Sequence, residues 1–261
     1  MAHLKDRCVE PMALETIKFD VMGRSAEDSD FHGIRTLLCK QLLPHTEVDV
    51  SNMADLVIEQ NYVGSVIVED CTDTMPDDDD DDDDLEEITL LGVTTVVSLQ
   101  EREKFPCIRQ LRELLQSLAE KHGGNQNVIE GLLREQPCKL GLLVNERFVN
   151  IPQTIAPPIF NSLKKELSSA VVKKMPFSFS HYVLIAKINK VKIDNVIEDE
   201  WVNQEEEFLD DKAVCKFEFP LECEDNEAIE EQMKQIGEVA YRRILVFKAD
   251  AFENLIDSLK I

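Results

Sequence analysis

The alternation of apolar and polar residues along the chain predicts an interleaved series of strands and helices. In residues 14–21 the side chains of Ile17, Phe19 and Val21 share one face of an extended segment, as in a half-buried strand. In residues 106–122 leucine and isoleucine recur at helical spacing, and Pro106 fits the first turn of a helix. Strands are predicted at 14–21, 64–69, 88–99, 139–144, 179–189, 213–220 and 242–249. Helices are predicted at 29–44, 51–61, 106–122, 126–136, 153–171 and 250–260.

The same pattern predicts how these elements are organised. Residues 88–99 are apolar on both faces, which places that strand near the centre of a sheet. The helix at 153–171 is expected to break or kink near Pro157 and Pro158. Residues 193–211 are acidic and expected to be irregular, whereas 222–238 could be a loop or a weak helix. This order favours an α/β (α+β) fold, with a mixed central sheet and helices on both faces.

The charge of the chain adds a segment that cannot pack. The net charge is −24 over 261 residues, and the eight aspartates at 77–84 contribute a third of it. Adjacent like charges repel one another, so residues 70–87 are predicted to form a disordered acidic loop between two strands. The rest of the chain contains enough apolar residues for a core. A single domain is therefore expected over 13–261, behind a flexible N-terminus at 1–12.

The acidic residues bear on the choice of partner. The aspartate run can be interpreted as an arm that contacts basic surfaces, as a weak trap for divalent cations, or as a solvated loop without a role. Outside the run a charge of −16 is spread along the chain. That surplus disfavours nucleic-acid binding, which depends on lysine and arginine. It favours a basic partner, such as a ribosomal protein, a histone or a basic peptide.

Cysteine usage and the lengths of the apolar runs indicate an intracellular chain. The seven cysteines are odd in number and form no CxxC pair, which indicates free thiols in a reducing compartment. No run of about eighteen apolar residues occurs that could span a membrane. Residues 1–11 lack the apolar centre of a secretory signal. The expected location is the nucleus and cytoplasm, without membrane contact.

The sequence lacks the motifs of common catalytic and cofactor sites. It contains no GxxxxGK[ST], no Gly-x-Gly, no HExxH and no GxSxG. His32, His45 and His122 fall at helix edges or ends, where a solvated surface is expected, and His181 could face either side of its strand. A cysteine paired with a histidine as nucleophile is a minor alternative. We therefore expect no enzyme, no cofactor and no metal.

A polar insert interrupts the apolar run that begins at residue 140. Leu140–Val144 is predicted to be a buried strand, and the adjacent Glu146 and Arg147 would point to opposite sides of an extended backbone. Asn150 suits a turn, and Pro152 suits the start of the next helix. In a structural corner, Arg147 would bond buried carbonyls or a carboxylate elsewhere in the chain. In a binding site, Glu146 would be presented to a basic client.

Three segments carry a resemblance to a known family. They are QNYVGSVI at 60–67, GLLVNERFVNIPQTIAPPIFNSL at 141–163 and EEEFLDDKAVCKFEF at 205–219, with an acidic segment after the first. Through them residues 15–260 resemble the BCCIP family, whose fungal relatives are called Bcp. The resemblance implies a GNAT-like topology without the acetyl-CoA loop, because that loop needs a Gly-x-Gly pattern to hold pyrophosphate. The structural residues of these motifs are taken to be Gly64, Gly141, Arg147, Asn150 and Pro152.

The resemblance also implies a function through protein partners. Family members are nuclear, and relatives are linked to ribosome biogenesis as chaperones of a basic large-subunit ribosomal protein of the universal L-fourteen type. Animal members are linked to homologous-recombination repair and cell-cycle control. Many relatives carry a long acidic N-terminal tail, whereas only a dozen ordinary residues precede the first predicted strand here. A lysine-rich insert found in some relatives is reduced to Lys187, Lys190 and Lys192. No nuclear-localisation signal is visible.

The leading hypothesis is a monomeric, non-enzymatic acidic adaptor or chaperone. It would bind such a ribosomal protein and support its nuclear delivery, without direct contact to nucleic acid. The second hypothesis is a scaffold for repair and cell-cycle proteins that uses an apolar groove for a partner helix. The third is an acetyltransferase-like enzyme. The candidate partner-binding residues are Asp77, Asp78, Asp79, Asp80, Asp81, Asp82, Asp83, Asp84, Glu86, Glu87 and Glu146.

Overall fold

The described part of the chain covers most of the predicted elements. The computed structural model describes residues 21–69, 90–101, 104–123, 125–135, 137–148, 151–194, 196–221 and 237–259. The expected flexible N-terminus, the acidic loop at 70–87 and nearly all of 222–238 lie outside these residues. The predicted strand at 14–21 is described only from Val21, where β1 begins.

The described strands form one mixed sheet. They are β1 (Val21–Arg24), β2 (Ser65–Glu69), β3 (Leu90–Ser98), β4 (Leu140–Arg147), β5 (His181–Ile193), β6 (Val196–Trp201), β7 (Ala213–Pro220) and β8 (Glu238–Lys248). The order is β1-β2-β3-β4-β5-β8-β7, and β6 pairs with β5 beside this path. β4 and β5 run parallel, while every other described pair is antiparallel. The predicted mixed sheet is confirmed.

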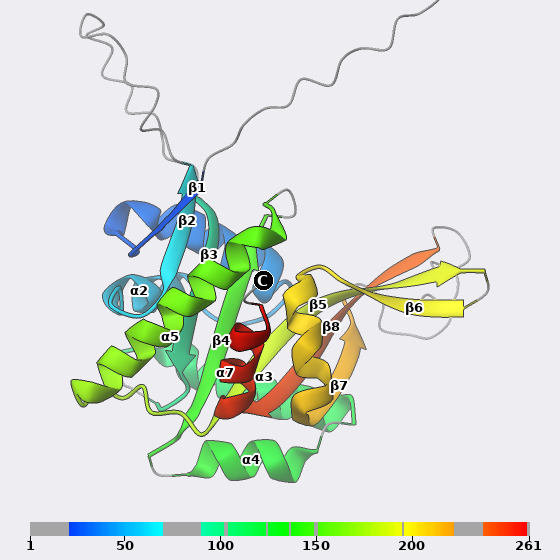
Figure 1. The fold of residues 1–261 in the computed structure, drawn as a ribbon. Coiled ribbons are helices and arrows are strands. Elements are labelled where there is room, and N and C mark those ends of the chain that lie inside the picture. Colours follow the sequence, from blue (N-terminus) through cyan, green and yellow to red (C-terminus); the bar gives the residue numbers. More distant parts are fainter. Residues whose placement is uncertain are drawn as a thin grey trace, which may run out of the picture.

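Helices cover both faces of this sheet, as predicted (Figure 1). One face packs against α1 (Phe31–Leu37), a π-helical turn η2 (Leu38–Leu42), α2 (Val50–Glu59), α3 (Pro106–Lys121) and α4 (Gln126–Arg134). The other face packs against α5 (Ala156–Val172), α7 (Ala249–Ser258) and the 3-10 helix η4 (Gln204–Lys212). No helix of the described residues is both long enough and apolar enough to cross a membrane.

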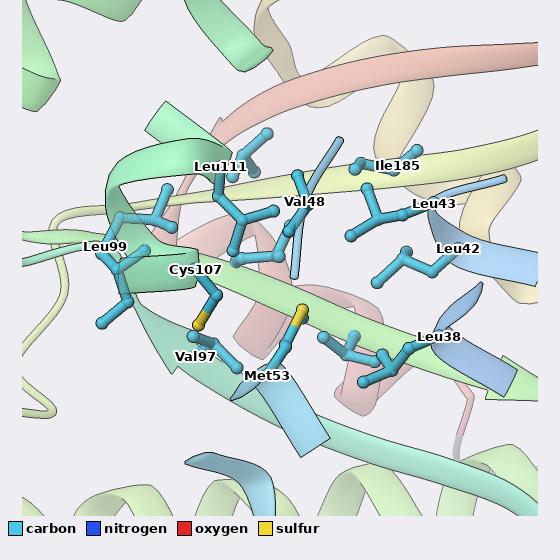
Figure 2. Close-up of a cluster of buried hydrophobic side chains, with 14 of the residues drawn as sticks. Leu38, Leu42, Leu43, Val48, Met53, Val97, Leu99, Cys107, Leu111 and Ile185 are labelled. Carbon is cyan, nitrogen blue, oxygen red and sulfur yellow. The ribbon is translucent and has the colours of Figure 1, made fainter. Parts of the chain in front are cut away.

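The larger core joins the first group of helices to the sheet (Figure 2). Leu38 of η2, Met53 of α2 and Leu111 of α3 meet Val97 of β3 and Ile185 of β5, and all are buried. Each buried side chain of this size contributes about 1.5–3 kcal/mol relative to exposure. β3 is buried along its whole length, which confirms the central position predicted from its apolar run.

The break or kink predicted near Pro157 and Pro158 takes the form of a change from a 3-10 turn to an α-helix just before the two prolines. Pro152 precedes a short 3-10 turn, η3 (Gln153–Ile155), and α5 begins at Ala156, so both prolines lie in its first turn. First-turn N–H groups have no partner within a helix, so proline removes no hydrogen bond there. The Pro157 carbonyl instead accepts a hydrogen bond from Asn161 Nδ2 at 2.8 Å.

The predicted irregular segment at 193–211 is wrong, because it contains β6 and η4. Residues 196–200 of β6 are all exposed, so the alternation of burial that marks a half-buried strand is missing. η4 is acid-rich and buries few of its residues, so its sequence carries little helical periodicity. Both elements form through tertiary contacts rather than through a local pattern.

Gly64 forms the close turn that leads into β2. Its φ is +107°, a value that favours glycine, and an added Cβ would lie 2.4 Å from Thr95 Cβ. The Gly64 N–H donates to Glu166 Oε2 of α5 at 2.7 Å, and Thr95 Oγ1 donates to the Val63 carbonyl at 2.7 Å. Gly141 of β4 has a different constraint, since a Cβ there would lie 2.7 Å from Val96 Cγ1. Steric constraints therefore explain why glycine occupies both positions.

Replacing Gly64 should destabilise the fold strongly. Gly64→Ala forces an L-residue into a strained backbone region and drives a methyl group into Thr95, which together should cost about 2–4 kcal/mol. Urea unfolding measures this free energy. Gly131→Ala in α4 is the control, because no atom lies within 4 Å of the added Cβ. It should be neutral or stabilise by up to about 1 kcal/mol, and equal losses in both variants would contradict the argument.

Candidate functional site

A buried polar network lies where β4 and β5 separate. The parallel pairing is confined to Leu140–Leu143 of β4 and His181–Leu184 of β5, although both strands continue beyond it. Further along, β5 pairs with β6, and the segment before η4 approaches β4 instead. Asn203 Nδ2 donates to the Asn145 carbonyl at 2.9 Å and so takes over the position of a strand partner.

Glu146 lies on the α1–α3 side of the sheet and pairs with Lys187 of β5. Lys187 Nζ donates to Glu146 Oε2 and, at 2.8 Å, to Gln41 Oε1 of η2. Arg242 Nη2 of β8 donates to the Gln41 carbonyl at 2.7 Å. Burial raises the pKa of Glu146 above its ordinary value, and the charge of Lys187 opposes that rise. This half of the network joins β4, β5, β8 and η2.

Arg147 lies on the opposite side of the sheet and pairs with Glu205 of η4. Its Nη1 and Nη2 donate to the two carboxylate oxygens of Glu205 at 2.5 and 2.9 Å, a bidentate geometry. Asn145 Nδ2 on the same face donates to Glu205 Oε1 at 3.1 Å. The prediction that Glu146 and Arg147 point to opposite sides is therefore confirmed, as is the carboxylate partner expected for Arg147 in a structural corner.

Glu206 is the third buried carboxylate of the network, and it makes no direct ion pair in the described structure. Its Oε1 accepts hydrogen bonds from Asn145 Nδ2 and Asn203 Nδ2, both at 2.8 Å. Burial raises the pKa of Glu206 to about 8, and the nearby negative charges of Glu205 and Glu146 act in the same direction. The two amides only partly offset this rise. Glu206 thus changes its protonation near pH 8 inside the buried network.

The composition of the network favours a structural role over chemistry. Glu146, Glu205 and Glu206 are balanced by Lys187, Arg147 and Arg242, so the cluster is neutral when every group is charged. Charges removed from water are tolerated only with such pairing. Among the described residues, no group of three or more His, Cys, Asp or Glu side chains is arranged to hold a metal.

The structure separates the predicted site residues into different places. Glu146 is 2% exposed, so its expected presentation to a client is corrected: the carboxylate faces Lys187 inside the molecule. Lys187, seen in the sequence as the remnant of a basic insert, is likewise buried. Asp77–Asp84, Glu86, Glu87 and Asn150 lie outside the described residues. Pro152 precedes the 3-10 turn and does not open α5 itself.

A surface groove of about 820 Å³ lies away from this network, between residues 44–48, α3 and the end of β7. Leu118 and Phe219 form apolar parts of its wall, and the ring of His122 stacks on Phe219 with centroids 5.1 Å apart. Burial and the neighbouring Lys121 lower the pKa of His122. His122 is therefore partly covered rather than freely solvated as expected. The groove offers a mixed apolar and polar surface to a partner.

The fold and the site define a mixed α/β protein whose buried ionic centre organises the sheet. The chain belongs to the BCCIP family, whose model matches residues 16–234. This confirms the resemblance drawn from the three motifs.

Two similar curated proteins align over most of the chain. The Protein BCCIP homolog of Drosophila melanogaster is 33% identical over 252 residues, which cover 94% of this chain and 84% of that protein. The human BRCA2 and CDKN1A-interacting protein is 30% identical over 262 residues, which cover 94% and 81%. The crystal structure of BCP1 from Saccharomyces cerevisiae matches with a TM-score of 0.63 at 16% identity, covering 95% of this chain and 90% of that one. That likeness shows the shared fold.

Removing one partner of the Glu146–Lys187 pair should destabilise the protein. Lys187→Met leaves a carboxylate buried without its cation, which should lower the free energy of unfolding by about 3–5 kcal/mol. The double variant Glu146→Leu with Lys187→Met should be more stable than Lys187→Met alone, because no uncompensated carboxylate is left. Urea unfolding measures the free energy of unfolding of the parent, of Lys187→Met and of the double variant. Lys192→Met, at an exposed position on the same strand, should change stability by less than about 0.5 kcal/mol. A Lys187→Met variant as stable as the parent would contradict the role of the pair.

Glu206 should make stability fall as pH rises. Its pKa is about 8 in the folded state against an ordinary 4.5, so the folded state holds a proton that the unfolded chain loses in that interval. The stabilisation from this proton is complete below pH 4.5 and is lost as the pH rises to about 8. Glu206→Gln should therefore gain stability relative to the parent as pH rises from about 5 to about 8.5, measured by urea unfolding. Glu207→Gln, at an exposed position in the same helix, is the control. Parallel pH profiles for the parent and Glu206→Gln would refute this assignment.

Proposed function

We propose that this protein is an acidic adaptor or chaperone that acts without catalysis. Its client would be a basic large-subunit ribosomal protein of the universal L-fourteen type, escorted between cytoplasm and nucleus in support of ribosome biogenesis. The observation that carries the proposal is the charge surplus: 52 acidic residues stand against 28 basic ones. Membership of the BCCIP family supports it, because the family resemblance implies this class of client.

The physical basis is that the acidic surface of this protein takes the place of RNA as the polyanion bound to the client. An unassembled ribosomal protein exposes lysines and arginines that later contact RNA, and a surface of opposite sign shields them. The buried charges of the described residues are nearly balanced, with Asp30, Glu146, Glu205 and Glu206 against Arg147, Lys187 and Arg242, so the acidic surplus of the chain lies on the surface. On η4, for example, Glu207 and Asp211 remain exposed. The free surface is therefore more acidic than the interior.

A second candidate function is a scaffold for repair and cell-cycle proteins. The human relative is named for interaction with BRCA2 and CDKN1A, which supports partners of this kind. The groove between residues 44–48, α3 and β7 is a surface that could accept a partner helix, with Leu118 and Phe219 as apolar contacts. Binding of this kind depends on buried anchors and tolerates salt better than binding by exposed charges.

Salt dependence should distinguish the two functions. The purified protein should bind the ribosomal protein at about 50 mM NaCl and lose at least tenfold in affinity at about 300 mM, because exposed charges are screened beyond a Debye length of about 10 Å at 0.1 M. Fluorescence anisotropy of the labelled ribosomal protein gives both dissociation constants. In parallel, light scattering should show that the ribosomal protein stays dispersed in the presence of this chain.

The aspartate run provides the matched variant. Replacing Asp77–Asp84 by four Gly-Ser pairs keeps the length and removes eight charges, and it should weaken low-salt binding if the run contacts the client. Unchanged affinity would assign binding to the rest of the acidic surface. No binding to the ribosomal protein, together with salt-resistant binding to repair or cell-cycle proteins, would reject the chaperone function and favour the scaffold.

A further inference from the structure

A two-stranded arm extends the sheet beyond its helical layers. β6 pairs with the outer half of β5, from Val196 opposite Ile193 to Trp201 opposite Ile188. Figure 1 shows β5, β6 and β8 running out from the helix-covered part of the molecule. The neighbouring position on β5 is taken by β4 at residues 181–184 only. β6 therefore has β5 on one side, and no strand of the described chain pairs with its other side.

The backbone of β6 presents hydrogen-bonding groups along this outer edge. The Val202 N–H donates to the Lys187 carbonyl at 3.1 Å, which fixes the phase of the antiparallel ladder. Backbone groups of alternate residues point to opposite sides of a strand. Val196, Glu198 and Glu200 therefore direct theirs toward β5. Ile197, Asp199 and Trp201 direct their backbone N–H and C=O groups outward, where an added strand could bond them.

The side chains of β6 select the chemistry of such a strand. Val196 and Ile197 are 57% and 56% exposed, so apolar surface flanks the edge at the tip of the arm. Glu198 and Glu200 share the face opposite to Ile197, are exposed, and make no ion pair within the described structure. Asp199 differs, because Arg243 and Lys190 neutralise it. Two unneutralised carboxylates on one face favour cationic side chains at alternate positions of the partner.

Charge also argues against a second copy of this chain as the occupant. Pairing β6 with β6 would bring Glu198, Asp199 and Glu200 of two molecules together, and like charges across strands are destabilising. The edge strand β7 has the usual protection of Lys216 and Pro220, whereas β6 contains neither lysine nor proline. The acidic residues of β6 therefore block self-association and leave the edge open to a basic strand.

We propose that the outer edge of β6 binds an extended basic segment of a partner protein as an added antiparallel strand. Lysine or arginine side chains of that segment lie beside Glu198 and Glu200, and the residues between them bond the outward backbone of Ile197 and Asp199. The antiparallel direction is chosen because its ladder is the more stable one. This proposal rests on the acidic adaptor function, for which it supplies a specific docking surface.

A peptide of alternating lysine and threonine tests the backbone geometry. In the proposed register lysines face the two glutamates, while the amide groups of the threonines point toward β6. Methylating the threonine nitrogens should weaken binding at least tenfold, since several hydrogen bonds are lost at about 0.5–1.5 kcal/mol each. Methylating the backbone amide nitrogens of the lysines instead adds the same number of methyl groups. Because these amides point away from β6, affinity should stay within about threefold. Fluorescence anisotropy with the full-length protein gives each dissociation constant.

Variants of the protein test the same edge. Ile197→Pro removes an outward N–H while leaving the bonds to β5, whereas Ile197→Ala removes only side-chain surface. The proline variant should lose about tenfold more affinity for the unmethylated peptide than the alanine variant. Glu198→Lys with Glu200→Lys should also lose at least tenfold. Its control, Glu120→Lys with Glu253→Lys, makes the same charge change at exposed positions on α3 and α7 and should lose far less.

The outcomes separate this proposal from the adaptor function. The antiparallel pairing would be overturned if both methylated peptides bound equally, or if only methylation of the lysine backbone nitrogens weakened binding. Either result would leave charge-based adaptor binding intact. Failure to bind both the peptide and the basic ribosomal protein at low salt would remove the adaptor function as well. Thermal unfolding checks that each variant is folded. If Ile197→Pro does not fold, the two methylated peptides alone decide the question with the parent protein.

Discussion

The separation of β4 from β5 is the constraint on which the rest of the structure depends. After Leu143 and Leu184 the two strands no longer bond each other, so the backbone and polar side chains of β4 need other partners. Asn203, Glu205 and Glu206 provide them from the segment around η4. The freed edge of β5 can then pair with β6. One local divergence thus determines both the buried ionic centre and the projecting arm.

The ionic centre is nearly balanced in charge, so the excess of anions over cations in this chain appears on the surface. Lys187, Arg147 and Arg242 are buried near the network, and Arg243 is engaged with Asp199 and Glu218 on the arm. The three buried cations are offset by the buried carboxylates Glu146, Glu205 and Glu206, so the surplus of acidic residues remains at the surface. Buried ion pairs add little net stability, since desolvation offsets much of their attraction. Their clearest effect here is to fix which strands and helices meet.

Local pattern predicts most of this fold, since α2 and α3 carry clear apolar periodicity and β3 is a continuous apolar run. It fails at β6, where every residue from 196 to 200 is exposed, and at the end of β4, where buried polar residues resemble a loop. Sequence also indicates that Glu146 and Arg147 point apart. It cannot identify Lys187 and Glu205 as their partners, because those contacts span about forty and sixty residues and depend on the sheet topology. Buried-strand polar residues do signal that partners of some kind exist.

The distribution of charge has a consequence for release as well as for binding in the proposed adaptor function. A client held by exposed carboxylates such as Glu198 and Glu200 stays exchangeable, because solvent and salt reach every contact. RNA presents a dense array of phosphate charges and competes for the same lysines and arginines. For comparison, a DNA duplex carries about one negative charge per 1.7 Å of its axis. A client that gains RNA contacts thereby loses its need for this surface. Strong apolar anchoring would oppose that transfer, so a moderately apolar, strongly acidic surface suits a protein that must hand its partner over.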